Sequence, residues 1–194
     1  MHAHTEALSQ ILPRADRAVV DVLLRLHQSI AELPADVWQQ EINVKLLGMV
    51  RVTRAALPLM NREGRGAIVN VSGITGKQVF PNGVVTGVIN AGVIAFTKYL
   101  AREVAPLGLR ANAICPGFVR TQGWEERAQK AAAAQGITAE AFFENFVRTH
   151  DIFLGRWGRP EEIAALVVLL ASPRMSYVTG HTFIADGGFG KFIS

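Results

Sequence analysis

One residue whose type alone offers chemistry is Lys45, inside a segment with helical spacing that runs from Asp36 to about Asn61. A lysine in a cleft can act as a base with a lowered pKa, or can form a Schiff base with a carbonyl compound. A lysine on an exposed helix face is only a solvated charge, and this second case is the commoner one. We therefore expect Lys45 to be solvated, and a chemical role stays open as the alternative.

The two tyrosines of the chain are not paired with a lysine at helical spacing. Tyr99 lies well along a predicted helix, and Tyr177 lies near the C-terminus. Four residues beyond them lie Glu103 and His181, so the pattern YxxxK does not occur anywhere. The sequence thus lacks a phenol whose acidity a lysine one turn away would raise.

The histidines, the single cysteine and the carboxylates show no metal-binding pattern. His2 and His4 lie too near the N-terminus to be assigned as ligands, and no other cluster has ligand spacing. His150 and Asp151 are adjacent and are predicted to form a surface turn. The lone Cys115 excludes an internal disulfide and fits a reducing compartment. We expect no metal site.

The elements that must position these residues alternate between buried strands and long helices. Compact apolar runs of the buried parallel-strand type cover residues 67–72, 111–117 and 182–188. Helices are predicted over 36–61, 86–105, 122–149 (two short helices broken near Gly136) and 160–171. One face of the second helix holds Ile89, Val93, Phe96, Leu100 and Val104. This order predicts a parallel sheet with helices on both faces.

Residues 16–33 admit two interpretations. Helical spacing, which we favour, joins Val19, Val22, Leu23, Leu26 and Ile30. The same stretch contains VVDVLL, which would also suit a short buried strand.

Several segments together resemble the short-chain dehydrogenase/reductase family. They are GAIVNVSG (66–73), NAGVIAFTKYLARE (90–103), LRANAICPGFVRT (109–121), GRPEEIAALVVLLAS (158–172) and YVTGHTFIADGG (177–188). Their order and spacing match the family from Trp38 to Ser194. The resemblance implies an α/β fold, a partial Rossmann-like doubly wound parallel sheet that lacks the first βαβ units. Residues 1–37 are then an atypical N-terminal segment, which we expect to be helical.

The family's opening strand and glycine-rich turn, TGxxxGxG, do not occur in this sequence. In that turn the bare backbone lets a pyrophosphate approach a helix N-terminus. None of the 18 glycines fits the pattern, and the nearest spacing, Gly83 and Gly87, lacks the third glycine. We therefore expect the chain to bind no NAD(P) by itself.

The resemblance also assigns four positions to proton chemistry, and this chain departs at all four. In the family a Tyr exchanges the substrate proton, a Lys four residues later lowers its pKa, a Ser polarises the carbonyl and an Asn holds a relay water. The matching positions here are occupied by Thr86, Asn90, Gly73 and Lys45, in that order. Ser72, beside the lost serine, is predicted to face away from the cleft. The resemblance implies that no catalytic site is intact.

Some ligand-facing positions remain. The loop that lines the nicotinamide pocket in the family matches Pro116, Gly117, Val119 and Thr121, although a strand end with a tight turn explains the Pro–Gly pair equally well. The position of the family's mobile substrate lid matches Trp124, Phe142, Phe143, Phe146 and Phe153. Their spacing is also typical of core packing. We expect any ligand of this region to be apolar or aromatic.

Composition excludes other classes of protein. Hydrophobic residues make up 49% and charged residues 19%, which suits a compact domain rather than a disordered chain. The net charge of +4 comes from scattered arginines, so we expect no nucleic-acid partner. No apolar run reaches the roughly 18 residues of a membrane span, and the N-terminus lacks a signal-peptide pattern. We expect no membrane partner and a cytoplasmic location.

These observations predict a non-catalytic subunit that forms an oligomer with itself or with an active dehydrogenase. In the family the helices that match residues 36–61 and 86–105 pack against a second subunit, and a strand at a sheet edge needs cover. One alternative is an NAD(P)-dependent oxidoreductase for a carbonyl or alcohol, with an incomplete N-terminus or a partner-supplied site. The others are an enzyme of different chemistry built around Lys45 and a small-molecule-binding protein that uses the lid pocket.

Overall fold

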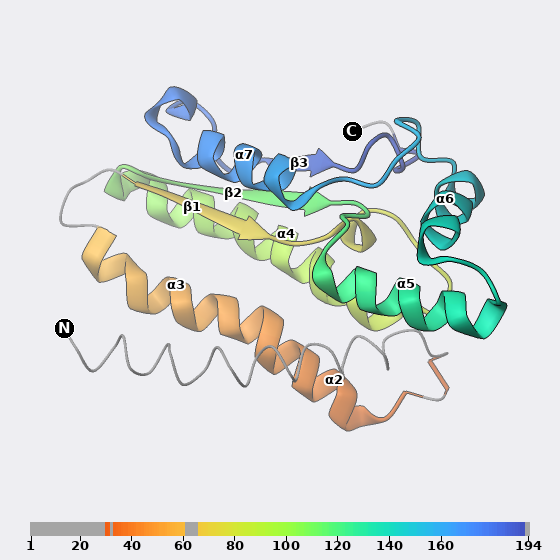
Figure 1. Ribbon diagram of the computed structural model, residues 1–194. Coiled ribbons are helices and arrows are strands. Elements are labelled where there is room, and N and C mark those ends of the chain that lie inside the picture. Colours follow the sequence, from red (N-terminus) through yellow and green to blue (C-terminus); the bar gives the residue numbers. More distant parts are fainter. Residues whose placement is uncertain (1–29, 32, 61–65, 193–194) are drawn as a thin grey trace, which may run out of the picture.

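The computed structural model describes residues 30–31, 33–60 and 66–192, and this part of the chain forms a parallel sheet between helices (Figure 1). The strand order is β1 (Gly66–Val71), β2 (Leu109–Pro116) and β3 (Thr182–Ala185). Gly66 is paired with Leu109, and Ala113 is paired with Thr182, both in parallel register. Figure 1 shows α7 on one face of the sheet and α4 on the other, which confirms the predicted layers.

The central strand β2 is buried on both faces. Ala111, Ala113, Ile114 and Cys115 have no exposed surface, as expected for an unbroken apolar run in a parallel sheet. The one amide in this run, Asn112, donates through Nδ2 to the Val178 carbonyl at 2.9 Å and accepts from the His181 N–H at 3.1 Å. Its buried polar atoms are therefore satisfied.

The helix predicted over 36–61 forms as three consecutive parts. These are α2 (Ala35–Glu41), a π-helical segment η1 (Ile42–Leu46) and α3 (Leu47–Met60). Lys45 lies in η1. π-Helical turns are rare and occur often at functional sites, so Lys45 lies in a kind of segment that is typical of such sites.

Helix α4 (Val84–Val104) forms the core beneath β2. Of the predicted apolar face, Ile89, Val93, Leu100 and Val104 are buried, and Phe96 packs partly buried against the same core. The segment Val84–Leu107 is long and apolar enough to cross a membrane, contrary to our expectation from the sequence. Its apolar length has another explanation, because one face of the helix is buried against the sheet.

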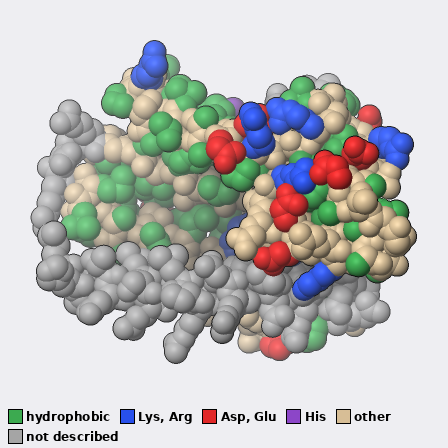
Figure 2. Space-filling model, viewed as in Figure 1, with side chains coloured by type: hydrophobic (Ala, Val, Ile, Leu, Met, Phe, Trp, Pro, Cys, Tyr) green, Lys and Arg blue, Asp and Glu red, His purple; other side chains and the backbone are tan. Residues whose placement is uncertain are grey.

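The two short helices predicted around Gly136 are α5 (Gln122–Gln135) and α6 (Ala139–His150). Gly136 ends α5 with φ = 65°, a left-handed conformation that glycine adopts without strain. The Thr138 hydroxyl caps α6 by accepting the Ala141 N–H at 3.1 Å. Figure 2 shows charged side chains of both signs gathered over the end of the molecule that holds these helices.

Helix α7 (Pro160–Ala171) begins and ends as predicted. Pro160 opens its first turn, and the Glu162 carboxylate accepts the Arg159 backbone N–H at 2.8 Å. Short η turns complete the described chain: η2 (Ile74–Gly76), η3 (Ala105–Leu107) and η4 (Pro173–Met175). The helix or strand predicted within 16–33 lies almost wholly outside the described residues, and α2 crosses the proposed boundary at residue 37.

Candidate active site

The carboxyl ends of the strands, where parallel α/β sheets bind their ligands, meet at one edge of the sheet. Gly73 follows β1, Gly117 follows β2 and Asp186 follows β3. A Cβ atom on Gly117 would lie 2.6 Å from the Asp186 Cβ, so the close approach of these two strand ends requires glycine there. Packing therefore accounts for Gly117 without a ligand.

Lys45 points from η1 toward α4. Its Nζ donates to the Asn90 Oδ1 at 2.6 Å and lies 3.5 Å from the Ser72 carbonyl oxygen. Burial lowers the pKa of Lys45, and the nearby Glu41 carboxylate opposes this with a smaller effect. Our expectation of a solvated helix charge was wrong, because the side chain is half-buried and bonded to a residue 45 positions away.

The orientation of the Asn90 amide follows from the chemistry of its two neighbours. An ammonium can only donate, so the atom that faces Lys45 must be Oδ1. Nδ2 then faces the Thr75 Oγ1, at 2.6 Å. Asn90 is only 3% exposed, so these two hydrogen bonds give both polar atoms of its buried amide a partner. Because the Thr75 oxygen accepts, its hydroxyl hydrogen remains to donate elsewhere, and no acceptor within the described residues takes it.

Gly73, at the family's serine position, makes room for this amide. A Cβ atom on Gly73 would lie 2.8 Å from the Asn90 Nδ2, closer than real Cβ contacts. The amide cannot move aside freely because Lys45 and Thr75 hold it from both ends. The departures at positions 45, 73 and 90 therefore fit one another and form a single packed group, which we call the Asn90 cluster (Lys45, Gly73, Thr75 and Asn90).

Ser72 supports the cluster without reaching a ligand. Its Oγ donates to the Asn90 carbonyl oxygen at 2.9 Å, and the residue is buried. It does not line the pocket described next, in agreement with the prediction that it faces away from the cleft. The hydroxyl is thus used for packing β1 against α4.

A pocket of about 450 Å³ lies against Thr75. Its volume is within the range of about 300–1,000 Å³ that is usual for small-molecule sites. Most of the surface that faces this pocket is apolar. The described residues of the lining are Ile74, Thr75, Phe80, Pro81, Gly83, Thr86, Phe118, Thr121, Gly123, Trp124, Glu126, Arg127, Lys130, Phe146 and His150. Lys45, Gly73 and Asn90 are not in the lining, so Thr75 connects the cluster to the pocket.

The predicted site residues divide between the pocket and the surrounding packing. Thr86 and Thr121 line the pocket, whereas Pro116, Gly117 and Val119 do not. Val119 instead forms a β-bridge with Gly158. Neither Tyr99 nor Tyr177 lines the pocket, and both are exposed.

The aromatic residues at the position of the family's substrate lid also divide between the pocket and the core. Trp124 and Phe146 line the pocket, Phe143 is buried in the core, and Phe142 packs against it partly buried. Phe153 is 71% exposed and lies outside this group. Helix α5 and helix α6 therefore supply one wall of the pocket, which we call the aromatic wall (Trp124, Phe146 and His150, with Phe118 from the loop after β2).

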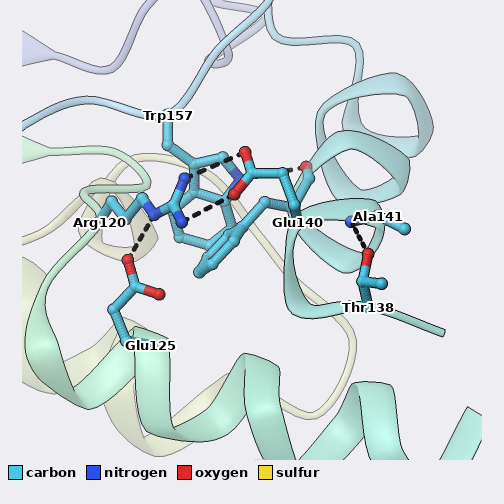
Figure 3. A network of polar contacts seen from close by, with 7 residues as sticks. Arg120, Glu125, Thr138, Glu140, Ala141 and Trp157 are labelled. Atoms are coloured by element: carbon cyan, nitrogen blue, oxygen red, sulfur yellow. Dashed lines mark hydrogen bonds and ion pairs between the residues drawn. The ribbon is translucent and has the colours of Figure 1, made fainter.

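Arg120 ties this wall together (Figure 3). Its guanidinium pairs with Glu140 of α6 at 2.9 Å and also with Glu125 of α5. These hydrogen bonds keep the pKa of Arg120 above its usual value. The guanidinium also lies 4.2 Å from the ring centre of Phe143, whose carbonyl accepts from Trp157 at 3.3 Å. One arginine thus fixes the loop after β2 to both helices.

His150 lines the pocket, so our prediction of a surface turn was wrong for this residue. Its ring stacks on Phe146 with centroids 3.8 Å apart, and its Nδ1 lies 2.9 Å from the Phe146 carbonyl oxygen. A carbonyl only accepts, so Nδ1 carries the hydrogen and Nε2 is the nitrogen that gains or loses a proton. The signal was present in the sequence, because His150 lies four residues beyond Phe146 on an amphipathic helix. Asp151 forms the exposed turn as predicted.

The family model described as Enoyl-(Acyl carrier protein) reductase matches residues 6–190. The sequence motifs placed the start of the resemblance at Trp38, and the family model extends it upstream to residue 6. Among curated proteins, the chain is 38% identical over 164 residues to a putative ketoacyl reductase of the monensin polyketide synthase from Streptomyces virginiae. That alignment covers 84% of this chain and 62% of the relative.

Two solved structures have the same fold as this chain. The L-sorbose reductase from Gluconobacter frateurii, complexed with NADPH and L-sorbose, has a TM-score of 0.83 at 29% identity, over 86% of this chain and 63% of that one. An NADPH-bound short chain oxidoreductase from Pseudomonas aeruginosa, described as containing an atypical catalytic center, has a TM-score of 0.77 at 31% identity. That comparison covers 86% of this chain and 62% of the other.

The chain therefore spans less than two thirds of the length of these three proteins. The parallel sheet, the family model over residues 6–190 and the shared fold of the solved structures indicate the same family. This chain belongs to the short-chain dehydrogenase/reductase family.

Proposed function

We propose that this chain is the substrate-binding part of an NAD(P)-dependent oxidoreductase that acts on the carbonyl or alcohol group of an apolar compound. The observation that carries the proposal is the 2.6 Å contact between the Lys45 ammonium and the Asn90 Oδ1, in space that Gly73 leaves open. Independent losses of function would not be expected to fit one another in this way. The NADPH-bound Pseudomonas aeruginosa relative with an atypical catalytic center supports cofactor use by family members with altered sites.

Thr75 is the group that we assign to the carbonyl oxygen of the substrate. Its oxygen accepts from Asn90, whose other amide atom is bound to the Lys45 ammonium. Hydrogen bonds in such a chain polarise one another, so the cation makes the Thr75 hydroxyl a stronger donor. A donor aimed at a carbonyl oxygen gains strength as negative charge develops on that oxygen.

His150 is the group that we assign to proton transfer. Reduction of a carbonyl leaves an alkoxide oxygen that needs a proton, and the protonated imidazole can give one from Nε2. In the oxidation direction the neutral Nε2 takes the alcohol proton. Lys45 acts instead as a positioning residue, because its contact with the substrate side passes through an amide that does not relay protons.

A nicotinamide dinucleotide would supply or take up the hydride when bound. Thr121 lines the pocket and follows the Pro116–Val119 loop at the carboxyl end of β2. This is the place at which parallel sheets of this type bind ligands, so these residues fit the nicotinamide end of the cofactor. The expectation from the sequence that the chain binds no NAD(P) by itself is the competing prediction, and the experiment below decides between it and this proposal.

The test is a titration of the purified chain with NADH and NADPH, with the mass of the protein measured in the same sample. A panel of aromatic and aliphatic ketones, with the matching alcohols, then tests turnover by the change in cofactor absorbance. We expect Thr75→Val to lower kcat by about 100-fold, while Thr75→Ser retains activity. Equal turnover by the Thr75→Val and wild-type proteins would contradict the assigned role, and no cofactor binding with no turnover would overturn the proposal.

A second candidate function is a non-catalytic subunit that assembles with itself or with an active dehydrogenase of the same family. Exposed apolar side chains favour it: Val52 is 60% and Leu59 is 64% exposed on α3, and Val88 is 53% exposed on α4. These helices are the ones expected to pack against another subunit. A dimeric or larger mass without cofactor binding would support this candidate, and a stable monomer that binds no relative would exclude it.

We propose that the protein acts in the cytoplasm and that nucleic acid and membranes are not its partners, on the basis of its composition. Fractionation of cells that produce the protein tests the first point.

A further inference from the structure

Arg127 is a charged side chain without a hydrogen-bonding or ion-pair partner among the residues that the structure describes. It lies half-buried on α5 and lines the pocket. Its guanidinium lies 5.1 Å from the ring centre of Trp124, and no hydrogen bond or ion pair from it occurs within the described residues. Burial lowers the pKa of Arg127, which is the direction expected when a cation loses water without gaining an anion.

Two arginines outside the lining of this pocket are used differently. Arg120 is bound by Glu125 and Glu140, and Arg156 is bound by Glu162. Some arginines besides Arg127 have no bonded partner within the described residues, but they are exposed and line no pocket: Arg54, Arg102 and Arg174. Among the described arginines, Arg127 is thus distinguished by partial burial, by its place in the lining and by the lack of a bonded partner in this part of the chain.

The charges around Arg127 favour an anion in the pocket. Lys130, three residues further along α5, lines the same pocket. Among the described residues of the lining, Glu126 carries the only carboxylate, and it accepts a hydrogen bond from Gln122 at 3.1 Å. His150 adds a positive charge when protonated. The remaining lining is mainly apolar, so two permanent cations face one carboxylate beside an aromatic surface.

We propose that the ligand of this pocket is an apolar compound that carries a carboxylate, which the Arg127 guanidinium binds. Two N–H groups of a guanidinium match the two oxygens of a carboxylate, and the partial exclusion of water strengthens the pair. The apolar body of the ligand contacts the aromatic wall. This inference rests on the proposed function only in treating the pocket as the substrate site, and it then makes the substrate a keto acid or a hydroxy acid.

The test compares the binding of two probes that differ only in charge. One is 3-benzoylpropionate, an aromatic keto acid, and the other is its methyl ester. Calorimetry measures both affinities for the wild-type chain, for Arg127→Gln and for the control Arg174→Gln, which changes an exposed arginine outside the pocket. Thermal unfolding of each variant verifies that it is folded.

We expect the wild-type protein and Arg174→Gln to bind the acid about tenfold or more tightly than the ester, and Arg127→Gln to lose this preference. Equal binding of the acid and the ester, a preference that survives in Arg127→Gln, or no binding of either probe would each overturn the inference. Because the readout is binding, a protein that prefers the acid but reduces no ketone would overturn the proposed function and leave this inference standing.

Discussion

The Asn90 cluster and the aromatic wall border the same pocket, but they use their polar atoms in different ways. In the cluster both amide atoms of Asn90 are bonded, and the backbone carbonyl at that position is bonded to Ser72. In the aromatic wall His150 Nε2 and the nearby Arg127 guanidinium make no bond within the described residues. The cluster therefore sets the geometry and reaches the ligand only through Thr75, whereas the wall lines the pocket directly. Changes at Lys45, Gly73 or Asn90 should alter stability, and changes in the wall should alter affinity.

The largest expected effect comes from leaving Lys45 without its acceptor. Asn90→Leu should destabilise the protein by about 3 kcal/mol, because a half-buried ammonium then loses its partner. The double variant Lys45→Met/Asn90→Leu should recover most of this loss, since it removes the charge as well. Denaturant unfolding monitored by circular dichroism measures both. A single variant as stable as the wild type would show that the contact does not organise the cluster.

A smaller effect is expected from filling the space at Gly73. Gly73→Ala should cost about 1–3 kcal/mol, because the new Cβ meets the held amide of Asn90. Gly123→Ala on α5 is the matched control, since a Cβ there meets nothing within 4 Å. The control should be neutral or slightly stabilising, because alanine favours the helix. Equal unfolding midpoints for the two variants would contradict the proposed fit.

The protonation of Lys45 predicts how stability changes with pH. Its pKa in the folded protein is lowered by burial, so between that lowered pKa and the ordinary value of 10.5 the unfolded chain binds more protons. The free energy of unfolding should therefore rise with pH across this window. The destabilising contribution is fully present below the window and absent above it. Subtracting the same pH series for Lys45→Met isolates this residue, and identical slopes would refute the assignment.

The smallest expected effect concerns the aromatic wall. The Arg120 hydrogen bond lowers the pKa of Glu140, so the stability that this pair contributes is present above pH 4.5 and is lost as the pH falls through the lowered pKa. Because Glu140 is exposed, Glu140→Gln should change global stability little. Tryptophan fluorescence should report a loosened contact between α6 and the loop after β2. An unchanged spectrum in the variant would show that Arg120 does not hold the wall.

Most of the fold follows from local patterns in the sequence. The buried face of α4, the break at Gly136 and the start of α7 at Pro160 each depend on residues within a few positions of one another. The strands were equally predictable from the sequence, because a buried parallel strand is an unbroken apolar run.

The site was less predictable because its contacts join distant segments. The sequence located Lys45, Gly73, Thr86 and Asn90 as departures, but the bond between Lys45 and Asn90 depends on how η1 packs against α4. Thr75 was missed, since nothing in its neighbourhood shows that Asn90 leaves its hydroxyl hydrogen unclaimed. His150 was missed because two adjacent polar residues were interpreted as a turn, and the helical spacing from Phe146 was not extended to them.

The close contact between Gly73 and Asn90 also constrains how this protein can change over generations. A serine at position 73 is acceptable only after the side chain at position 90 has moved away. A lysine at position 90 would bring a second ammonium against Lys45. The effect of each substitution thus depends on the residues that its neighbours in the Asn90 cluster already carry, which is epistasis within one packed group. A serine at position 73 while Asn90 is retained, or a lysine at position 90 while Lys45 is retained, should therefore each be destabilising.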